Sequence, residues 1–388
     1  MTERAGRQLL AALALGLAAA SLQAATLTIG VLSRADDERL DPKRVELGYL
    51  GQPGGPISQA VEMAVKETDF ELGDAKLQVK VDAVEVADAA AAKAALQKFE
   101  KSGAAAVLLD LPAAWIASSA TAVKLPLINA GDASDSLRAS CTPNLFHTLP
   151  SERMRADAMA QILMSRRWQK VLVLYGPTPE DAERSAVAQA SIKRYAIKSV
   201  AVKPFKLSAD PRERALGNPL LLTGGTDYDA VWIIDSDGEF ARTLPYRTQL
   251  PRPVVGDGGL FALGWAPHFE RFGSPQLIRR FEREAHRPMV SQDWAAWMAT
   301  KAVLEAALEQ PASPGAAQVM KALTRPDFVL DGFKGVRVSF RPWDRQLRQP
   351  MLMTDGQGVV AIAPAEGVLH PKNVLDTLGL DQPESKCK

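Results

Sequence analysis

The chain has 388 residues, of which 47% are hydrophobic and 23% charged, a composition typical of a globular protein. Outside residues 1–24, 44 basic and 44 acidic side chains balance, so no net field favours binding to nucleic acid or to an anionic membrane. The length exceeds a single ordinary hydrophobic core and predicts two lobes.

Residues 1–24 have the pattern of a secretory signal peptide. Arg4 and Arg7 precede an uncharged run, Leu9 to Ala20, that ends in small residues before Ala24 and Ala25. The run is too short to span a bilayer, and no later stretch approaches the ~20 apolar residues of a spanning helix. We therefore expect a soluble periplasmic protein, cleaved after Ala24 or Ala25. The alternative interpretation is a buried N-terminal helix.

Strands and helices alternate through the next part of the chain. The predicted order is strand 26–32, a helix from Pro56, strand 77–84, helix 87–101, strand 104–109, helix 115–123 and strand 125–129. The Gly/Pro-rich loop 51–56 lacks the residue order of a phosphate-binding or dinucleotide-binding loop and is predicted to be a flexible loop beside a hinge.

The alternation continues after a break near residues 146–150. Ser151 is predicted to cap a helix that ends at Arg166. The elements that follow are strand 170–175, helix 179–195, strands 199–205, 230–235 and 253–256, helices 275–286, 292–310 and 313–323, and strands 336–340, 351–354 and 359–363. The last two strands flank a turn at 355–358, which indicates a hairpin. Repeated βα units predict an α/β fold of mainly parallel sheets flanked by helices.

Nearly every predicted strand end carries a carboxylate. Parallel sheets bind ligands beyond the carboxyl ends of their strands, so two facing lobes would form a cleft between these groups. Helix capping explains at least half of them. Converging carboxylates otherwise need a cationic or hydroxyl-rich guest, and a hard cation such as Ca²⁺ stays open as an alternative. The groups are Asp36, Asp37, Glu38, Asp110, Asp132, Asp135, Glu180, Asp181, Asp235, Asp237 and Asp257.

Aromatic residues divide between this cleft and the core. Trp115 and Trp265 follow predicted strands or glycines in loops and suit either place. Trp294 and Trp297 lie within an apolar helix, and Trp232 lies mid-strand, so these three are predicted to be core residues.

Signs of catalysis are few. The four histidines, at positions 147, 268, 286 and 370, have no metal-ligand spacing, and no G-x-S-x-G motif offers a nucleophilic serine. We expect no enzymatic activity and no cofactor.

Cys141 and Cys387 are the only cysteines in the sequence. In an oxidising compartment they are predicted to form a disulfide that closes a loop spanning 246 residues. The alternative is two separate free thiols.

Several segments resemble a known family. Leu27-Thr-Ile-Gly-Val-Leu, Asn144-Leu-Phe-His-Thr-Leu-Pro-Ser and Val171-Leu-Val-Leu-Tyr-Gly are similar to the type I periplasmic solute-binding proteins of ABC transporters, in the leucine/isoleucine/valine class. Three further segments resemble the branch encoded beside PQQ-dependent alcohol oxidation systems. They are Arg287-Pro-Met-Val-Ser-Gln-Asp-Trp-Ala-Ala-Trp, Arg341-Pro-Trp-Asp-Arg-Gln-Leu-Arg-Gln-Pro and His370-Pro-Lys-Asn-Val-Leu-Asp-Thr-Leu-Gly-Leu.

The resemblance implies a two-lobed periplasmic-binding-protein type I fold with three crossovers, near Thr148, Gly256 and Gly335. One lobe would comprise residues 25–148 plus 257–334, and the other residues 149–256 plus 335–388. It also implies a monomer that closes on a small ligand and delivers it to an inner-membrane ABC permease, with no nucleic-acid partner.

The sequence departs from the amino-acid binders at their anchor positions. The helix start and the Gly-Ala-Thr segment that hold a ligand carboxylate in that family correspond here to Leu111-Pro-Ala-Ala-Trp and Gly131-Asp-Ala-Ser. The acid that holds the ligand ammonium corresponds to Asp257. We therefore predict a small cationic, metal-complexed or hydroxyl-bearing ligand, with amino-acid transport, a sensor subunit or an enzyme of the oxidation pathway as alternatives. The predicted binding residues are Trp115, Asp132, Ser134, Tyr175, Asp235, Asp237 and Asp257.

Overall fold

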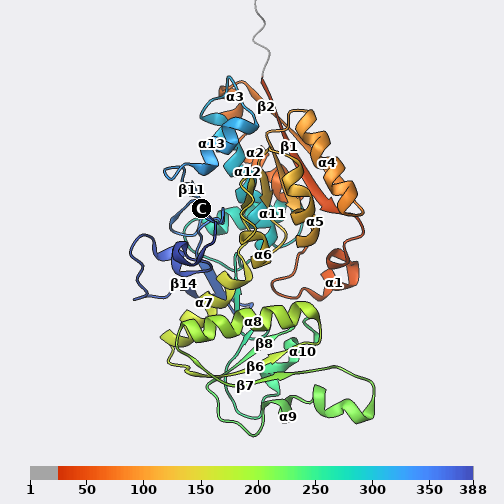
Figure 1. The fold of residues 1–388 in the computed structure, drawn as a ribbon, viewed down its shortest axis with the longest axis vertical. Helices are drawn as coiled ribbons and strands as arrows, with labels where there is room; N and C mark the ends of the chain where they lie inside the picture. The colour runs from red at the N-terminus through yellow and green to blue at the C-terminus, as the bar shows by residue number, and fades with distance from the viewer. Residues whose placement is uncertain (1–24, 388) are drawn as a thin grey trace, which may run out of the picture.

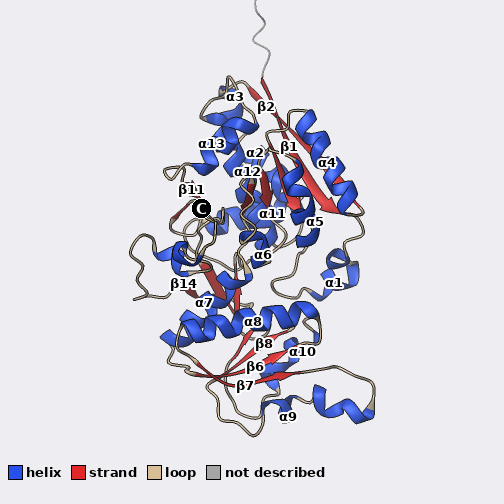
Figure 2. Cartoon of the chain, in the orientation of Figure 1, coloured by secondary structure: helices blue, strands red, loops and turns tan. Residues whose placement is uncertain are grey.

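The computed structural model describes residues 25–387, so the predicted signal peptide lies outside the described residues. Two α/β bodies lie one above the other along the longest axis (Figure 1). Helices cover the faces of a parallel sheet in each body (Figure 2). Within residues 25–387, no helix is both long and apolar enough to cross a membrane.

The first body contains a five-stranded sheet in the order β2-β1-β3-β4-β5, with every neighbouring pair parallel. Ile29 of β1 packs on one face, while Leu32 packs on the other, as the alternation of a strand requires. The strands are β1 (Ala25–Arg34), β2 (Leu77–Val86), β3 (Ala106–Asp110), β4 (Leu127–Asn129) and β5 (Leu145–His147). The sequence predicted the first four, but not β5.

The predicted helices of this body appear in the predicted order, and three short helices that the sequence did not predict, at 42–47, 69–74 and 135–138, are added. The predicted helix 115–123 is instead a helix over 113–119 followed by a 3₁₀ turn. The helices are α1 (Pro42–Leu47), α2 (Ser58–Glu67), α3 (Asp69–Asp74), α4 (Ala89–Lys101), α5 (Ala113–Ser119), α6 (Asp135–Arg138), α11 (Ser274–Ala285), α12 (Ser291–Leu308) and α13 (Ala316–Thr324). Trp294 and Trp297 of α12 are fully buried in the core, as predicted.

The second body contains a four-stranded parallel sheet in the order β7-β6-β8-β9. Ser151 caps its first helix by accepting a hydrogen bond from the Met154 N–H, as predicted. The strands are β6 (Lys170–Tyr175), β7 (Lys198–Pro204), β8 (Ala230–Ile234) and β9 (Val254–Gly256). The helices are α7 (Glu152–Ser165), α8 (Pro179–Arg194), α9 (Pro219–Thr223) and α10 (Glu239–Thr243). Trp232 of β8 lies in the core between this sheet and α7.

A small antiparallel sheet stands beside α7. It consists of β10 (Phe261–Leu263), β13 (Met351–Thr354) and β14 (Val359–Ala363), and the predicted terminal hairpin is its β13–β14 pair. The predicted strand 336–340 is reduced to β12 (Arg337–Val338), which pairs with β11 (Leu330–Asp331). The lobe boundaries stay a prediction, but Ala262 of β10 packs in the same core cluster as α7.

Two hinge segments, residues 147–150 and 345–350, run side by side between the bodies. The His147 N–H donates to the Arg345 carbonyl at 3.0 Å, and the Leu347 N–H donates to the His147 carbonyl at 2.8 Å. The Gln349 side chain donates to the Thr148 carbonyl at 2.7 Å. These contacts fix the two segments to each other.

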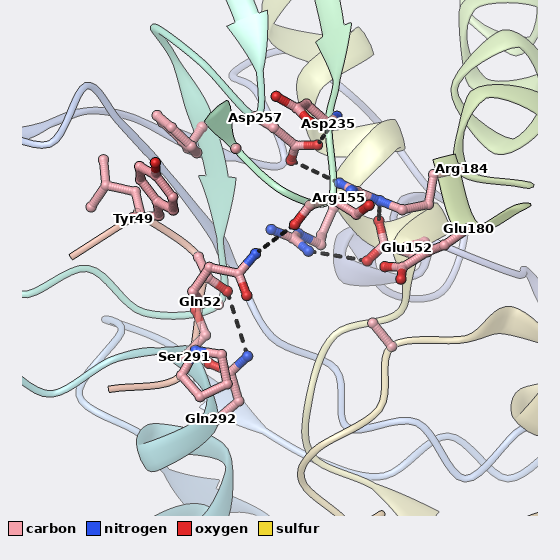
Figure 3. A pocket seen from close by; sticks show the side chains of 18 of the residues that line it. Tyr49, Gln52, Glu152, Arg155, Glu180, Arg184, Asp235, Asp257, Ser291 and Gln292 are labelled. Atoms are coloured by element: carbon pink, nitrogen blue, oxygen red, sulfur yellow. Dashed lines mark hydrogen bonds and ion pairs between the residues drawn. The ribbon is translucent and has the colours of Figure 1, made fainter. Parts of the chain in front are cut away.

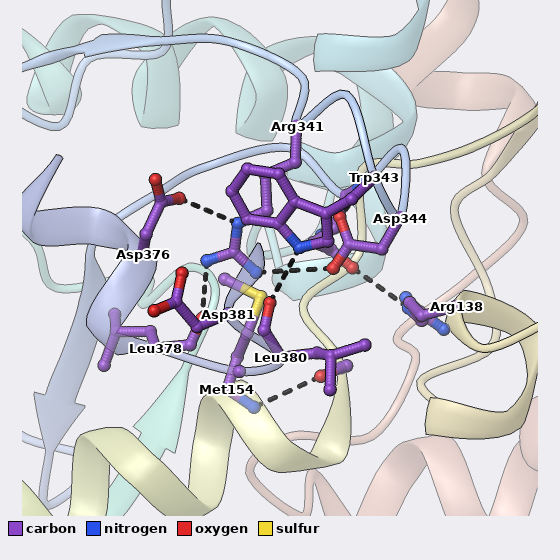
Figure 4. A network of polar contacts seen from close by, with 12 residues as sticks. Arg138, Met154, Arg341, Trp343, Asp344, Asp376, Leu378, Leu380 and Asp381 are labelled. Carbon is purple, nitrogen blue, oxygen red and sulfur yellow. Dashed lines mark hydrogen bonds and ion pairs between the residues drawn. The ribbon is translucent and has the colours of Figure 1, made fainter. Parts of the chain in front are cut away.

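The C-terminal tail, residues 364–387, packs against this hinge. The fully buried Arg341 guanidinium donates to Asp376 at 3.0 Å and to the carbonyls of Leu375 and Leu378 at 2.9 and 2.6 Å. Figure 4 shows this network with Trp343, whose indole donates to the Leu380 carbonyl. The predicted disulfide between Cys141 and Cys387 is confirmed and ties the tail to the first body.

Candidate ligand-binding cleft

A cleft of about 1140 Å³ lies between the two bodies, at the carboxyl ends of both parallel sheets. The first body contributes the loops after β1 and β4, a segment at 47–53 and the start of α12. The second contributes the starts of α7 and α8 and the loops after β8 and β9. Figure 3 shows side chains from both walls converging on the space. The cleft therefore lies where the sheet topology predicted it.

The lining is strongly charged. Eight carboxylates and five guanidinium groups face the cleft, a formal excess of three negative charges. The carboxylates are Asp132, Asp135, Glu152, Glu180, Glu183, Asp235, Asp257 and Asp355. The predicted acidic character of the cleft is therefore present, although the arginines are a feature that reading the strand ends did not emphasise.

On the wall of the second body, Arg184 of α8 joins two acids. Its guanidinium contacts Asp257 at 2.7 Å and Glu152 at 3.2 Å, and Glu152 also pairs with Arg155 at 3.0 Å. Burial alone would raise the pKa of the Glu152 carboxyl, but the two arginines lower it to about 2. The other Asp257 oxygen accepts the Asp235 N–H at 2.8 Å. Both oxygens of Asp257 are thus already bonded within the protein.

On the wall of the first body, the Asp132 carboxylate accepts hydrogen bonds from two nearby backbone N–H groups. One carboxylate oxygen accepts the Ala113 N–H at 2.9 Å, and the other accepts the Ser134 N–H at 2.8 Å. Beside it, a Cβ on Gly131 would lie 1.9 Å from a carboxylate oxygen of Asp110, so only glycine fits there. Arg39 in turn binds Asp110 at 2.7 Å.

Two polar groups in the cleft have no partner. Among the described residues, nothing donates a hydrogen bond to Glu180 or forms an ion pair with it. Glu180 is exposed to solvent in the cleft. Partial burial raises the pKa of its carboxyl most strongly, the Arg184 guanidinium lowers it, and the negative charges of Glu152, Asp181 and Asp132 add to the rise. Gln292, at the start of α12, is 9% exposed and donates to the Gly51 carbonyl at 3.5 Å. Its side-chain oxygen is buried without a donor among residues 25–387.

A cover segment, residues 44–52, reaches from the first body to the second. Arg44 and Gln52 both donate to the Ser236 carbonyl, at 3.1 and 3.3 Å. The Tyr49 ring lies 5.7 Å from the Arg242 guanidinium of α10. The sequence predicts the loop at 51–56 to lie beside a hinge. In the structure its first residues, Gly51, Gln52 and Pro53, line the cleft.

Four of the seven predicted binding residues line the cleft: Asp132, Ser134, Asp235 and Asp257. Asp237 lines a neighbouring depression next to the cover segment. Trp115 packs on the α4/α5 side of the first sheet and Tyr175 packs against the second core, so neither is among the described lining residues. Trp265 is fully buried, with its ring centroid 6.0 Å from that of Trp294.

Sequence reasoning missed the cleft residues that lie on helices. Glu152 and Arg155 of α7, Arg184 of α8 and Gln292 of α12 follow no strand directly, so a search of strand ends passes over them. Gln52 follows a glycine in the Gly/Pro-rich loop, which was the available signal. Within residues 25–387, no three His, Cys, Asp or Glu side chains are grouped so that they could hold a metal ion.

Comparisons with known proteins agree on the architecture. A family model described as the receptor family ligand binding region matches residues 57–202. A branched-chain amino acid ABC transporter periplasmic ligand-binding protein from Burkholderia xenovorans LB400 superposes with a TM-score of 0.67 at 14% identity, covering 87% of this chain and 95% of that one. The chain has the type I periplasmic-binding-protein fold. This confirms the predicted two-lobed α/β architecture.

Other solved structures have the same fold. A periplasmic binding protein from Burkholderia mallei matches with a TM-score of 0.66 at 14% identity, over 93% of this chain and 98% of that one. A solute-binding protein from R. palustris in complex with benzoate matches with a TM-score of 0.63 at 13% identity, over 87% and 96%. No curated protein sequence matches this chain.

Proposed function

We propose that this protein is the periplasmic solute-binding component of an ABC importer and captures a small ligand by closing its two lobes. The observation that carries the proposal is the cleft of about 1140 Å³, lined from both bodies, in a fold that solved solute-binding proteins share. A ligand that contacts both walls favours the closed state through the additional contacts it makes there. The protein would act as an exported monomer that delivers its ligand unchanged to an inner-membrane permease.

We further propose that the transported compound belongs to PQQ-dependent alcohol oxidation. The support is the resemblance of segments 287–297, 341–350 and 370–380 to that branch. A role in uptake is favoured over a sensor role because the solved relatives described above include ABC transporter proteins.

Amino acids fit this cleft poorly. Asp132 occupies the N–H groups of Ala113 and Ser134, which correspond to the positions that hold the ligand carboxylate in the amino-acid binders. Arg184 forms an ion pair with Asp257, which corresponds to the acid that binds the ligand ammonium group in the amino-acid binders. The protein thus supplies its own carboxylate and its own cation at both anchors, so an amino acid would have to displace two internal contacts.

A solute screen on the mature protein tests the proposal. A ligand at a hundredfold excess over its Kd should stabilise the protein by about 2.7 kcal/mol, seen as a higher thermal midpoint. The same ligand should reduce the radius of gyration in small-angle X-ray scattering and be recovered unchanged. Chemical conversion of the solute, or stabilisation by many solutes without any closure, would contradict a transport role.

A further inference from the structure

This inference rests on the proposed function and names its ligand class. We propose that the cleft binds a small organic cation with N–H donors, a primary amine or a guanidinium compound, held between Glu180 of the second body and the side-chain oxygen of Gln292 in the first. The two residues lie on different walls in Figure 3. A ligand that reaches both would therefore link the lobes.

The charge of the lining favours a cation. Eight carboxylates face five guanidinium groups, and the three most engaged arginines are already paired. Arg184 binds Glu152 and Asp257, Arg155 binds Glu152, and Arg39 binds Asp110. Glu180 lies close enough to the carboxylates of Glu152 and Asp132 to be repelled by them, and Arg184, the nearby cation that offsets this repulsion, is already shared between Glu152 and Asp257. An added cation relieves this repulsion, whereas an added anion increases it.

The buried oxygen of Gln292 indicates a hydrogen-bond donor on the ligand. A buried acceptor without a partner costs roughly 1–3 kcal/mol, so native structures rarely keep one unless something binds there. The Gln292 amide nitrogen lies 3.5 Å from the Gly51 carbonyl, and the side-chain oxygen is buried with no donor among residues 25–387. Carboxylates, ethers and quaternary ammonium groups cannot donate to it. Amines and guanidinium groups can.

The alternatives lack an equivalent site. A bare metal ion would need at least three grouped ligands, and the described residues contain no such group. A carboxylate would need free N–H groups on the first wall, where Asp132 already accepts the Ala113 and Ser134 N–H groups. A neutral diol could donate to Gln292 but would leave the formal excess of three negative charges in the cleft lining unchanged.

Isothermal titration of the mature protein with five probes tests this class. The probes are 1,4-diaminobutane and guanidinium as N–H cations, 1,4-butanediol as the neutral analogue, succinate as the anionic analogue, and tetramethylammonium as a cation without N–H. We expect at least one N–H cation to bind at least tenfold more tightly than the other three probes. Tighter binding of succinate or butanediol, or equal binding of tetramethylammonium, would overturn the inference.

Variants locate the contacts. Glu180→Gln and Gln292→Met should each weaken binding of the N–H cation at least tenfold, without lowering the thermal midpoint of the free protein. Glu183→Gln is the matched control, because Glu183 lies on the same helix, lines the same cleft and is exposed, as Glu180 is. Equal losses in all three variants would show a diffuse field in place of the proposed contacts. If both N–H cations fail while another solute closes the lobes, the inference falls and the proposed function stands; if no solute closes them, both fall.

Discussion

The hinge and the cleft are both rich in polar side chains, but they use them in opposite ways. In the hinge, Gln346 donates to the carbonyls of His147 and Leu149, and its oxygen accepts from the buried Arg138. In the cleft, Glu180 has no partner and Gln292 uses only its nitrogen. A network in which every donor and acceptor is paired specifies one geometry. A group without a partner can instead be paired by a bound ligand.

The segments that resemble the branch beside PQQ-dependent alcohol oxidation lie mostly on the hinge side. Residues 341–350 include the segment that runs beside residues 147–150, and residues 370–380 belong to the tail that packs on it. The exception is Gln292, within segment 287–297. There the Arg287–Asp293 pair, at 2.7 Å, and the Val290 N–H that donates to Asp293 fix the start of α12 and so place Gln292 in the cleft. The segments that carry this resemblance thus lie in the scaffold more than in the cleft.

Removing the disulfide should have the largest effect on the hinge side. The double variant Cys141→Ser/Cys387→Ser releases a loop spanning 246 residues, which should lower the free energy of unfolding by about 4 kcal/mol because the unfolded chain gains freedom. Urea unfolding measures the loss, and affinity for the N–H cation should stay within twofold. A loss below about 1 kcal/mol would mean that noncovalent contacts alone hold the tail.

Breaking the network around the buried Arg341 should lower the free energy of unfolding slightly less than removing the disulfide does. Arg341→Met leaves Asp344 and Asp376 buried with one guanidinium fewer, although Arg348 still contacts Asp376 at 2.7 Å. We expect a loss of about 3 kcal/mol in urea unfolding. Arg212→Met is the control, since that side chain is 90% exposed. A variant of normal stability that fails to bind ligand would show that this network controls the cleft.

The fold was predictable because the main signals are local. Apolar runs such as 104–109 and helices such as 179–195 appear within one or two residues of their predicted ends. The missed strands, β5, β10 and β11, are two or three residues long, and their strand geometry depends on pairing with other segments. No periodicity can be read from so short a segment.

The cleft was predictable only in part, because pairing decides which charges are free. Asp132 and Asp257, which the strand-end rule places at the cleft, line it, and their binding to a ligand stays a prediction. That Asp257 is neutralised by Arg184, 73 positions away, is a tertiary fact that spacing does not carry. Trp115 was placed in the cleft by proximity to a strand, but it lies within the first turn of α5, whose packing directs it elsewhere.

Removing the Glu152 carboxylate, which pairs with Arg155 and Arg184 in the cleft, should lower the free energy of unfolding by a moderate, pH-dependent amount. Because Arg155 and Arg184 lower the Glu152 pKa from 4.5 to about 2, its carboxylate stabilises the folded state above pH 4.5, and this stabilisation is lost as the pH falls toward 2. With the side chain 19% exposed, Glu152→Gln should cost about 2 kcal/mol at neutral pH. Urea unfolding at several pH values should show the difference from wild type shrinking in acid. Glu46→Gln, at an exposed site, should show no such trend.

The smallest expected effect lies in the cover segment, where the two regions meet. Arg44 and Gln52 make two partly buried hydrogen bonds to the Ser236 carbonyl, so removing both should cost about 1 kcal/mol of contact between the bodies. Arg44→Ala/Gln52→Ala should then increase the radius of gyration of the ligand-free protein in small-angle X-ray scattering while leaving urea unfolding unchanged. Lys43→Ala, on the exposed side of the same helix, is the control. An unchanged radius of gyration together with a lower free energy of unfolding would contradict this. The contacts of the cover segment would then hold the fold together, as those of the hinge do, and would not bias closure.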